Sequence, residues 1–305
     1  MSRKKSWPTI IMILLLLVTI GIIGIIGIIG IYHPNKSSKQ QGINVVTSLP
    51  FYQEAAQAVL GKYGKAISLI NNASIDPHDF KPTTNDANQV AKANIIIENG
   101  LGYDSWLSKM SINKTQKIIN VAKLMNKHNG ANEHLWYDMA TMPMLTKTLI
   151  KKFSKIDPIH KKQFENNGQK YLKKLSILNT QEQTLAKNSH YQNVAVSEPV
   201  FDYALQKMHY HIIDRHFELA IENGTDPSPQ DIANLQNNIK NHKIAFFVNN
   251  SQTSDHITNN LVSLAHQFHV PVLQVTETMP NNKNYIEWIH SEFNQLEKIQ
   301  TDEAK

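Results

Sequence analysis

The sequence predicts an α/β protein in which two similar lobes of parallel β-sheet, covered by helices, are joined by one long rigid helix and preceded by an N-terminal transmembrane helix. From residue 43 onward, short β-branched runs alternate with helical patterns, which is typical of parallel sheets. A single long helical pattern separates two such series, and an uncharged stretch precedes the first. A chain of 305 residues is long enough for this arrangement.

The uncharged stretch is Thr9–Tyr32, 24 residues in length. As a helix it spans about 36 Å, enough to cross a hydrocarbon core of about 30 Å. A cleaved signal peptide normally has a shorter apolar region that ends at small residues, and neither feature is present. Basic residues within segment 1–8 place that segment in the cytoplasm. We therefore expect a single-pass plasma-membrane anchor, a polar tether at 33–42 and an extracytoplasmic remainder.

The first lobe is expected at residues 43–150. Its strands are predicted near Ile43–Thr47, Ala66–Ile70, Asn94–Glu98 and Lys117–Val121. Its helices are predicted near Phe51–Leu60, Asn85–Ala91 and Tyr103–Lys109. Strands that alternate with helices in this way form parallel neighbours, because each crossover carries a helix onto one face of the sheet.

The second lobe is expected at residues 189–305 and repeats the pattern. Its strands are predicted near Asn193–Val196, Tyr210–Ile213, Lys243–Val248 and Pro271–Val275. Its helices are predicted near Phe201–Lys207, Pro229–Ile239, Asp255–Phe268 and Tyr285–Ile299. The two lobes should therefore resemble each other in architecture.

Between the lobes, residues 151–188 predict the connecting helix. Asp157 followed by Pro158 is a helix-start signal, because a capping side chain precedes a proline that needs no N–H in the first turn. Apolar residues recur at helical spacing, namely Phe164, Tyr171, Leu175, Leu178 and Leu185. A single helix from Pro158 to about Lys187 would be a rigid connection between the lobes. Gly168 leaves open that it is broken into two.

Composition excludes several classes of function. The chain has no cysteine, which rules out disulfides, thiolate metal sites, thiol nucleophiles and lipid attachment through cysteine. Three of the basic residues precede Thr9, so residues 33–305 carry a net charge of only +3. We therefore expect no nucleic-acid partner. Phosphate-binding loops of the G-x-x-x-x-G-K-[ST] type and H-E-x-x-H motifs are also absent, which argues against ATP hydrolysis and zincin chemistry.

Four residues lie beyond the carboxyl ends of predicted strands, where open α/β sheets bind ligands. They are His78, His134, Glu198 and Glu277. Two imidazoles and two carboxylates suit a divalent first-row metal. Each residue also has a structural explanation: the glutamates as charges at helix N-termini, His78 as part of a turn and His134 as a helix cap. The residues alone leave both interpretations open.

The motifs resemble the zinc and manganese solute-binding proteins of ABC importers, the cluster A-I metal-binding family. The resemblance rests on INVVTSLPFYQEAAQAVLG, DPHDFKPTTNDANQVAKANIIIENGLGYDSWL, NEHLWYD, SEPVFDYALQKMHY and VPVLQVTETMP. The resemblance begins at the first of these segments and covers almost everything from residue 43 to about 290. The resemblance implies two α/β lobes joined by one long rigid helix, with a metal ion held between them.

The resemblance also implies the ligand set. The histidine of the DPH motif carries over to His78, and the histidine of NEHLWYD carries over to His134. Glu198 in SEPVFDY takes the third position, and Glu277 takes the fourth, where the family usually has aspartate. Two other family features are absent: the histidine- and acid-rich loop of some zinc-specific members, and the lipidated cysteine that the Thr9–Tyr32 helix would replace.

The expected function is extracytoplasmic capture of one Mn²⁺ or Zn²⁺ and its delivery to an ABC permease subunit, by a monomer that is not an enzyme. Four protein ligands leave no position for an activated water. Carboxylate oxygens are hard donors, so we expect manganese as the cargo. The alternatives are an extracellular mononuclear metallohydrolase, with Glu198 or Glu277 as general base, and a surface adhesion or scaffold protein with a structural metal.

Overall fold

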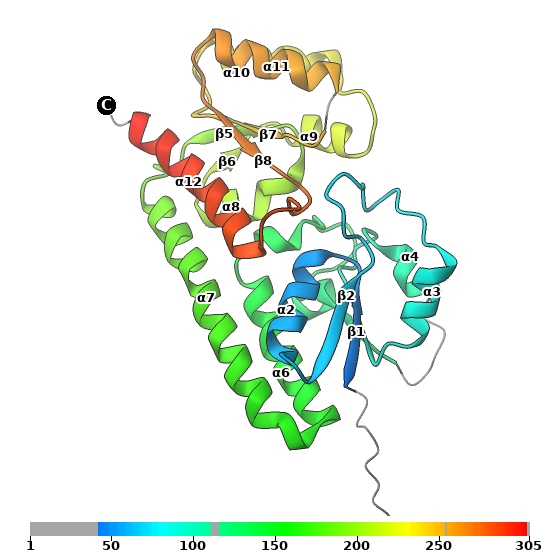
Figure 1. Ribbon diagram of the computed structural model, residues 1–305. Coiled ribbons are helices and arrows are strands. Elements are labelled where there is room, and N and C mark those ends of the chain that lie inside the picture. The colour runs from blue at the N-terminus through cyan, green and yellow to red at the C-terminus, as the bar shows by residue number, and fades with distance from the viewer. Residues whose placement is uncertain (1–41, 111–115, 254, 304–305) are drawn as a thin grey trace, which may run out of the picture. The chain divides into compact units, whose positions relative to one another are not determined.

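The computed structural model describes residues 42–110, 116–253 and 255–303, and the chain from Gly42 onward forms one compact unit. This unit contains two four-stranded parallel sheets with helices around them (Figure 1). The predicted α/β class with parallel sheets is confirmed. The predicted anchor Thr9–Tyr32 lies outside the described residues. Within the described ranges, no helix combines the length and apolar character that crossing a membrane requires.

The first sheet has the strand order β2-β1-β3-β4. Its strands are β1 (Ile43–Thr47), β2 (Gly64–Ser68), β3 (Ile95–Glu98) and β4 (Lys117–Asn120). The associated helices are α2 (Pro50–Leu60), α3 (Thr84–Ala91), α4 (Ser105–Met110), α5 (Val121–Leu124) and α6 (Thr141–Ile156). Alternate residues of a strand face opposite sides of the sheet. Val45 accordingly belongs to the main core with α2, whereas Val46 packs in a smaller cluster with Val90 of α3 and Leu107 of α4.

The second sheet has the strand order β6-β5-β7-β8. Its strands are β5 (Asn193–Val196), β6 (His211–Ile212), β7 (Phe247–Asn250) and β8 (Val272–Val275). The associated helices are α8 (Asp202–Lys207), α9 (Arg215–Glu222), α10 (Pro229–Lys240), α11 (His256–Gln267) and α12 (Tyr285–Glu303). Three short 3₁₀ turns are η1 (Leu135–Tyr137), η2 (Pro158–His160) and η3 (Pro199–Phe201). The carboxyl ends of both sheets carry the loops described below.

The connecting helix α7 (Lys161–Lys187) is continuous. Asp157 begins the segment as predicted, because its side chain accepts a hydrogen bond from the backbone N–H of His160. Gly168 does not break the helix. A Cβ at this position would lie 2.3 Å from Cδ1 of Ile150 on α6, so a side chain here would have to displace the end of the Ile150 side chain.

One hydrophobic core extends through both sheets. It includes Val45 and Leu149 from the first half, Leu178 from α7, and Val196 and Leu296 from the second half. Helix α7 contacts α2 and α6, which precede it in the sequence, and α8 and α12, which follow it. The shared core explains why the region from Gly42 onward forms a single unit. The predicted lobe boundaries at residues 150 and 189 stay a prediction.

Two local predictions need correction. The strand expected at Lys243–Val248 is β7, Phe247–Asn250, because the preceding residues reach β5 only through isolated hydrogen bonds such as that from Ala245 N–H to Asn193 O, 2.8 Å. The strand expected at Tyr210–Ile213 contains only two residues. Helix α9 was not predicted, and it carries a residue of the site described next.

Candidate metal centre

His134 lies at the centre of a buried polar cluster. It directly precedes η1, and its side chain is fully buried. Asn132 fixes it twice, because the Oδ1 atom of Asn132 lies 2.8 Å from both the backbone N and the ring Nδ1 of His134. Since an amide oxygen accepts a hydrogen bond, Nδ1 carries a proton, and in the neutral, metal-binding form of the ring the lone pair of Nε2 is directed into the cluster. Nε2 has no hydrogen-bond partner among the described residues.

His78 reaches the same cluster from the loop after β2. Its backbone N–H donates to Asp76 Oδ1 at 2.8 Å, and Trp106 Nε1–H donates to the carbonyl of Pro77 at 3.2 Å. The imidazole packs edge-on against Tyr103, with ring centroids 4.7 Å apart. These contacts set the direction of an otherwise exposed side chain, of which 41% is accessible.

Glu277 follows β8 and approaches His134. Its Oε1 atom lies 3.9 Å from His134 Nε2 and accepts a hydrogen bond of 2.7 Å from the hydroxyl of Tyr103. Tyr103 therefore contacts both Glu277 and His78, and it links residues from the two halves of the chain. The structure thus brings three of the four predicted ligands, His78, His134 and Glu277, to one place.

Glu222 is a member of the cluster that the sequence did not single out. Its Oε1 atom lies 3.9 Å from Nε2 of both His78 and His134. It is the last residue of α9, a helix joined to α8 at its start by Arg215, whose Nη1 donates to Asp202 at 2.7 Å and to Glu218 of α9 itself at 2.5 Å. The amphipathic run before Asn223-Gly224 was the available signal.

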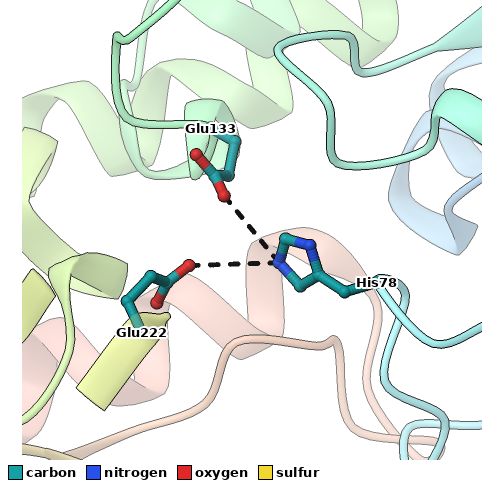
Figure 2. A group of neighbouring side chains, drawn as sticks. All are labelled: His78, Glu133 and Glu222. Carbon is teal, nitrogen blue, oxygen red and sulfur yellow. Dashed lines mark ion pairs between the residues drawn. The ribbon is translucent and has the colours of Figure 1, made fainter. Parts of the chain in front are cut away.

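Glu133 completes the group from the side of the first sheet. Its Oε1 atom lies 3.8 Å from His78 Nε2. Figure 2 shows the carboxylates of Glu133 and Glu222 directed toward the same nitrogen of His78 from two different segments. One ligand atom from each of these three residues lies within 4.8 Å of the others, the spacing of a possible cation site.

Glu198 lies beside this group and has other partners. Its Oε2 atom accepts hydrogen bonds from Asn250 Nδ2 at 2.6 Å and from Thr253 Oγ1 at 2.9 Å. The charges of Glu277 and His134 both influence its pKa, which burial raises above the usual range. Within the described part of the chain, no ion pair joins Glu198 to either histidine.

The pKa values show how strongly these side chains interact. Burial acts to lower the pKa of His134, but the carboxylates of Glu277, Glu222 and Glu133 outweigh it and raise the pKa to about 9. Burial raises the pKa of Glu222 to about 7 against the opposing effect of His134. For Glu277, burial is outweighed by His134 and Tyr103, and its pKa is lowered. The cluster therefore favours positive charge at its centre.

The cluster is chemically suited to a divalent cation. Metal bonds to imidazole nitrogen and carboxylate oxygen are about 2.0–2.2 Å long, so two donors 3.9 Å apart can share one ion. A cavity of about 340 Å³ lies beside Glu277 and is lined by Ala73, Asp76, Gln252 and Thr253 among others. Through this cavity, which lies between the loop before His78 and the residues after β7 and β8, solvent can reach Glu277.

Residues 45–299 match the family described as ZnuA, zinc-uptake complex component A, periplasmic. The chain belongs to this family. The resemblance to zinc and manganese solute-binding proteins of ABC importers is thereby confirmed, since the match extends through both sheets and the connecting helix.

Curated relatives include a high-affinity zinc uptake system protein ZnuA from Bacillus subtilis, 22% identical over 74% of this chain and 76% of its own length. A metal ABC transporter substrate-binding lipoprotein from Lactococcus lactis is 31% identical, but the match covers only 35% of this chain and 39% of that relative. A manganese-binding lipoprotein MntA from Halalkalibacterium halodurans is 21% identical over 55% of this chain and 58% of its own length.

Two solved structures have the same fold at low identity. The periplasmic zinc-binding protein TroA from Treponema pallidum has a TM-score of 0.70 at 15% identity, covering 85% of this chain and 99% of its own. FpvC from Pseudomonas aeruginosa, in complex with Ni²⁺, has a TM-score of 0.71 at 15% identity, covering 86% of this chain and 98% of its own. This chain therefore shares its α/β fold with both of these proteins.

Proposed function

We propose that this protein captures one divalent metal ion, Mn²⁺ or Zn²⁺, outside the cytoplasm and delivers it to the permease of an ABC importer. The observation that carries the proposal is His134 Nε2, a fully buried nitrogen without a hydrogen-bond partner in the described residues, set 3.9 Å from two carboxylate oxygens. A buried polar atom without a partner is costly unless a ligand satisfies it. Relatives named as zinc-uptake and manganese-binding proteins support the choice of metals.

The proposed ligands are His78, His134, Glu198 and Glu277, with Glu222 as an additional carboxylate. Glu222 strengthens the case for a hard ion with more than four donors, because carboxylate oxygens suit Mn²⁺ and can bind through one or both oxygens. Zinc remains the stronger binder for most sites of this kind in solution, by the Irving–Williams order. We therefore propose manganese as the cargo in the cell and expect tight binding of both ions in the test tube.

We also propose that Thr9–Tyr32 anchors the protein as a single membrane-spanning helix, with residues 42–305 acting as a monomer on the extracytoplasmic side. Support comes from the 24 uncharged residues and the basic residues before them. The anchor would take the place of the lipid that the names of several relatives indicate. Delivery needs no catalysis by this chain, since its proposed task is binding and release.

The test is elemental analysis of the purified full chain followed by competitive titration with Mn²⁺ and Zn²⁺. One bound equivalent is expected, and His78→Ala should reduce the affinity at least about 100-fold, because loss of an outer partner alone costs 10–100-fold. His211→Ala is the matched control, since His211 is exposed on β6 and lies in the second sheet. Equal affinities of the two variants, or no stoichiometric metal, would refute the proposal.

A further inference from the structure

The corner at which α6 meets α7 is basic and carries exposed apolar side chains. Between Lys147 and Lys162 the chain has six lysines and one acid, Asp157. All six are exposed: Lys147, Lys151, Lys152, Lys155, Lys161 and Lys162. Ile156 and Ile159 are 42% and 76% exposed at the turn itself. None of these features belongs to the metal centre.

The lysines of this corner are poorly neutralised. Lys161 pairs with Glu165 at 3.8 Å, and in the described ranges the other five have no ion pair within 4.0 Å. The single acidic residue of the segment, the buried Asp157, pairs with His160: its Oδ2 atom lies 2.6 Å from Nδ1 of His160. The corner therefore presents an unbalanced positive charge to solvent.

The corner is also well ordered by packing. His160 stacks on Tyr63 with ring centroids 4.1 Å apart, and Phe164 lies edge-on to the same tyrosine and to Phe153. Beyond the turn, α6 and α7 remain in contact, and Ile150 of α6 lies against Gly168 of α7. Ile159 thus projects from a fixed surface, and its exposure does not result from a frayed end.

The chain enters the folded unit at this same corner. Ile43 N–H donates to the carbonyl of Tyr63 at 3.3 Å, and Tyr63 is the residue on which His160 stacks. Figure 1 shows the α6–α7 turn at the end of the molecule where β1 begins. Nine residues lie between Tyr32 and Gly42, and the ten steps from one Cα to the next can span at most about 36 Å. If Thr9–Tyr32 crosses a membrane, the corner is tethered close to its surface.

We propose that the α6–α7 corner docks on an anionic phospholipid surface, with Ile159 inserted among the headgroups and the surrounding lysines paired with lipid phosphates. Clustered lysines are attracted to anionic headgroups, and their aliphatic stems can lie along the interface while the ammonium groups remain hydrated. The tether raises the effective concentration of the corner at the bilayer, so this inference rests in part on the proposed anchor. Docking would keep the soluble unit next to the membrane that holds its permease.

The absence of cysteine from the chain allows a direct test with single-cysteine labelling. Ile159→Cys in the full chain is labelled with an environment-sensitive fluorophore and reconstituted into vesicles of phosphatidylcholine, with or without about one third phosphatidylglycerol. We expect a blue-shifted emission and quenching by lipid-borne quenchers in the anionic vesicles only, reversed by about 1 M salt because screening shortens to about 3 Å.

Two variants serve as controls. Ile177→Cys is matched to Ile159→Cys, since Ile177 is 54% exposed on α7 but lies about 27 Å farther along the helix from position 159. Its label should stay in water in both kinds of vesicle. Changing Lys151, Lys152 and Lys155 together to Gln should weaken docking about 5-fold for each lysine removed. These exposed residues are outside the core, so the fold should be retained.

The outcomes separate the corner from the anchor. Flotation with neutral vesicles reports the anchor, and the emission of the label at position 159 reports the corner. If the chain floats with both kinds of vesicle while this label stays in water, the corner proposal is wrong and the anchor stands. If the chain floats with anionic vesicles only and the label enters lipid, docking is supported without the anchor. No flotation with either kind would refute both.

Discussion

Two buried carboxylates near the end of β8 have opposite protonation behaviour. Glu277 faces the imidazole of His134 and the hydroxyl of Tyr103, and its pKa is lowered although burial acts to raise it. Glu292, on α12, is 3% exposed, and burial raises its pKa to about 8. Glu277 directly follows Thr276 in the sequence, and Glu292 accepts a hydrogen bond from the Thr276 N–H. Burial acts to raise both pKa values, so the neighbouring groups decide the direction of the shift at Glu277.

Burial of Glu292, together with one of its hydrogen bonds, favours a proton on this side chain. The hydroxyl of Tyr137 lies 2.6 Å from the carbonyl oxygen of Thr276 and 2.8 Å from Glu292 Oε2. A hydroxyl has one proton, and a carbonyl can only accept. If Tyr137 donates to Thr276, then Glu292 must donate to Tyr137, which it can do only when neutral.

The comparison separates a carboxylate that is satisfied by the fold from one that is available to a ligand. Glu292 Oε1 accepts from Thr276 N–H at 3.0 Å and from Trp288 Nε1–H at 2.8 Å. Glu277, in contrast, lies next to His134, whose Nε2 has no hydrogen-bond partner among the described residues. Glu277 therefore has the surroundings of a binding site, because it faces a histidine with an unpaired nitrogen. Glu292 has the surroundings of a buried structural group, because backbone and side-chain donors already bind its carboxyl group.

The largest expected effect is on Glu277. Glu277→Ala should reduce the affinity for Mn²⁺ and Zn²⁺ at least about 100-fold, because it removes a charged donor from the cluster. Isothermal competition against a chelator measures this loss. Glu292→Gln is the matched control, since it changes the other buried carboxylate and should leave the metal affinity within about 3-fold. Similar losses in both variants would contradict the distinction between the two sites.

A smaller effect is expected for Glu222. Glu222→Gln keeps the side-chain volume but removes a negative charge 3.9 Å from both histidines, and the affinity should fall about 10-fold. The loss should be larger for Mn²⁺ than for Zn²⁺ if the carboxylate supplies a hard fifth donor. Parallel titrations with the two ions give the ratio, with Glu165→Gln on the exposed face of α7 as control. An unchanged ratio would remove Glu222 from the ligands.

The smallest effect concerns stability and pH. The pKa of Glu292 is higher in the folded protein than in the unfolded chain, so its stabilising contribution is complete below about pH 4.5 and is lost as pH rises toward 8. Glu292→Gln mimics the protonated form and should remove this dependence. Relative to the natural chain, the variant should therefore gain up to about 1.4 kcal/mol of unfolding free energy per pH unit in this range.

Urea unfolding of both chains at several pH values between 5 and 8, with a chelator present, measures this difference. Because the comparison is between two chains at the same pH, other titrating groups cancel to first order. A difference that does not change with pH would show that Glu292 is ionised in the folded protein.

Local sequence patterns predicted much of the fold because the strands are short, apolar and β-branched. β1 and β5 have the predicted bounds, and α7 begins after the predicted Asp157-Pro158 signal. The role of Gly168 could not be predicted, since a glycine within a helix signals weakness until the neighbouring helix is known. Here Ile150 of α6 occupies the space that a side chain would need.

The sequence likewise predicted some residues of the candidate site and missed others. The strand-end rule and the family motifs identified His78, His134 and Glu277, whose side chains the fold brings together, and also Glu198, which bonds to Asn250 and Thr253 beside them. Glu222 was missed because it lies at the end of a short helix, where a glutamate is ordinary. The predicted ligand set stays a prediction until metal binding is measured.

By itself, the sequence determined the alternation of strands and helices, the position of the long helix and the two motif histidines, because these depend on residue types over short stretches of chain. The tertiary structure decided which carboxylates meet those histidines and whether the pKa of a glutamate is raised or lowered. Glu222 and Glu277 are 55 residues apart, and Glu292 depends on Tyr137 from the other half of the chain. Protonation and ligation are set by distances of a few ångströms between such residues, which local sequence patterns do not specify.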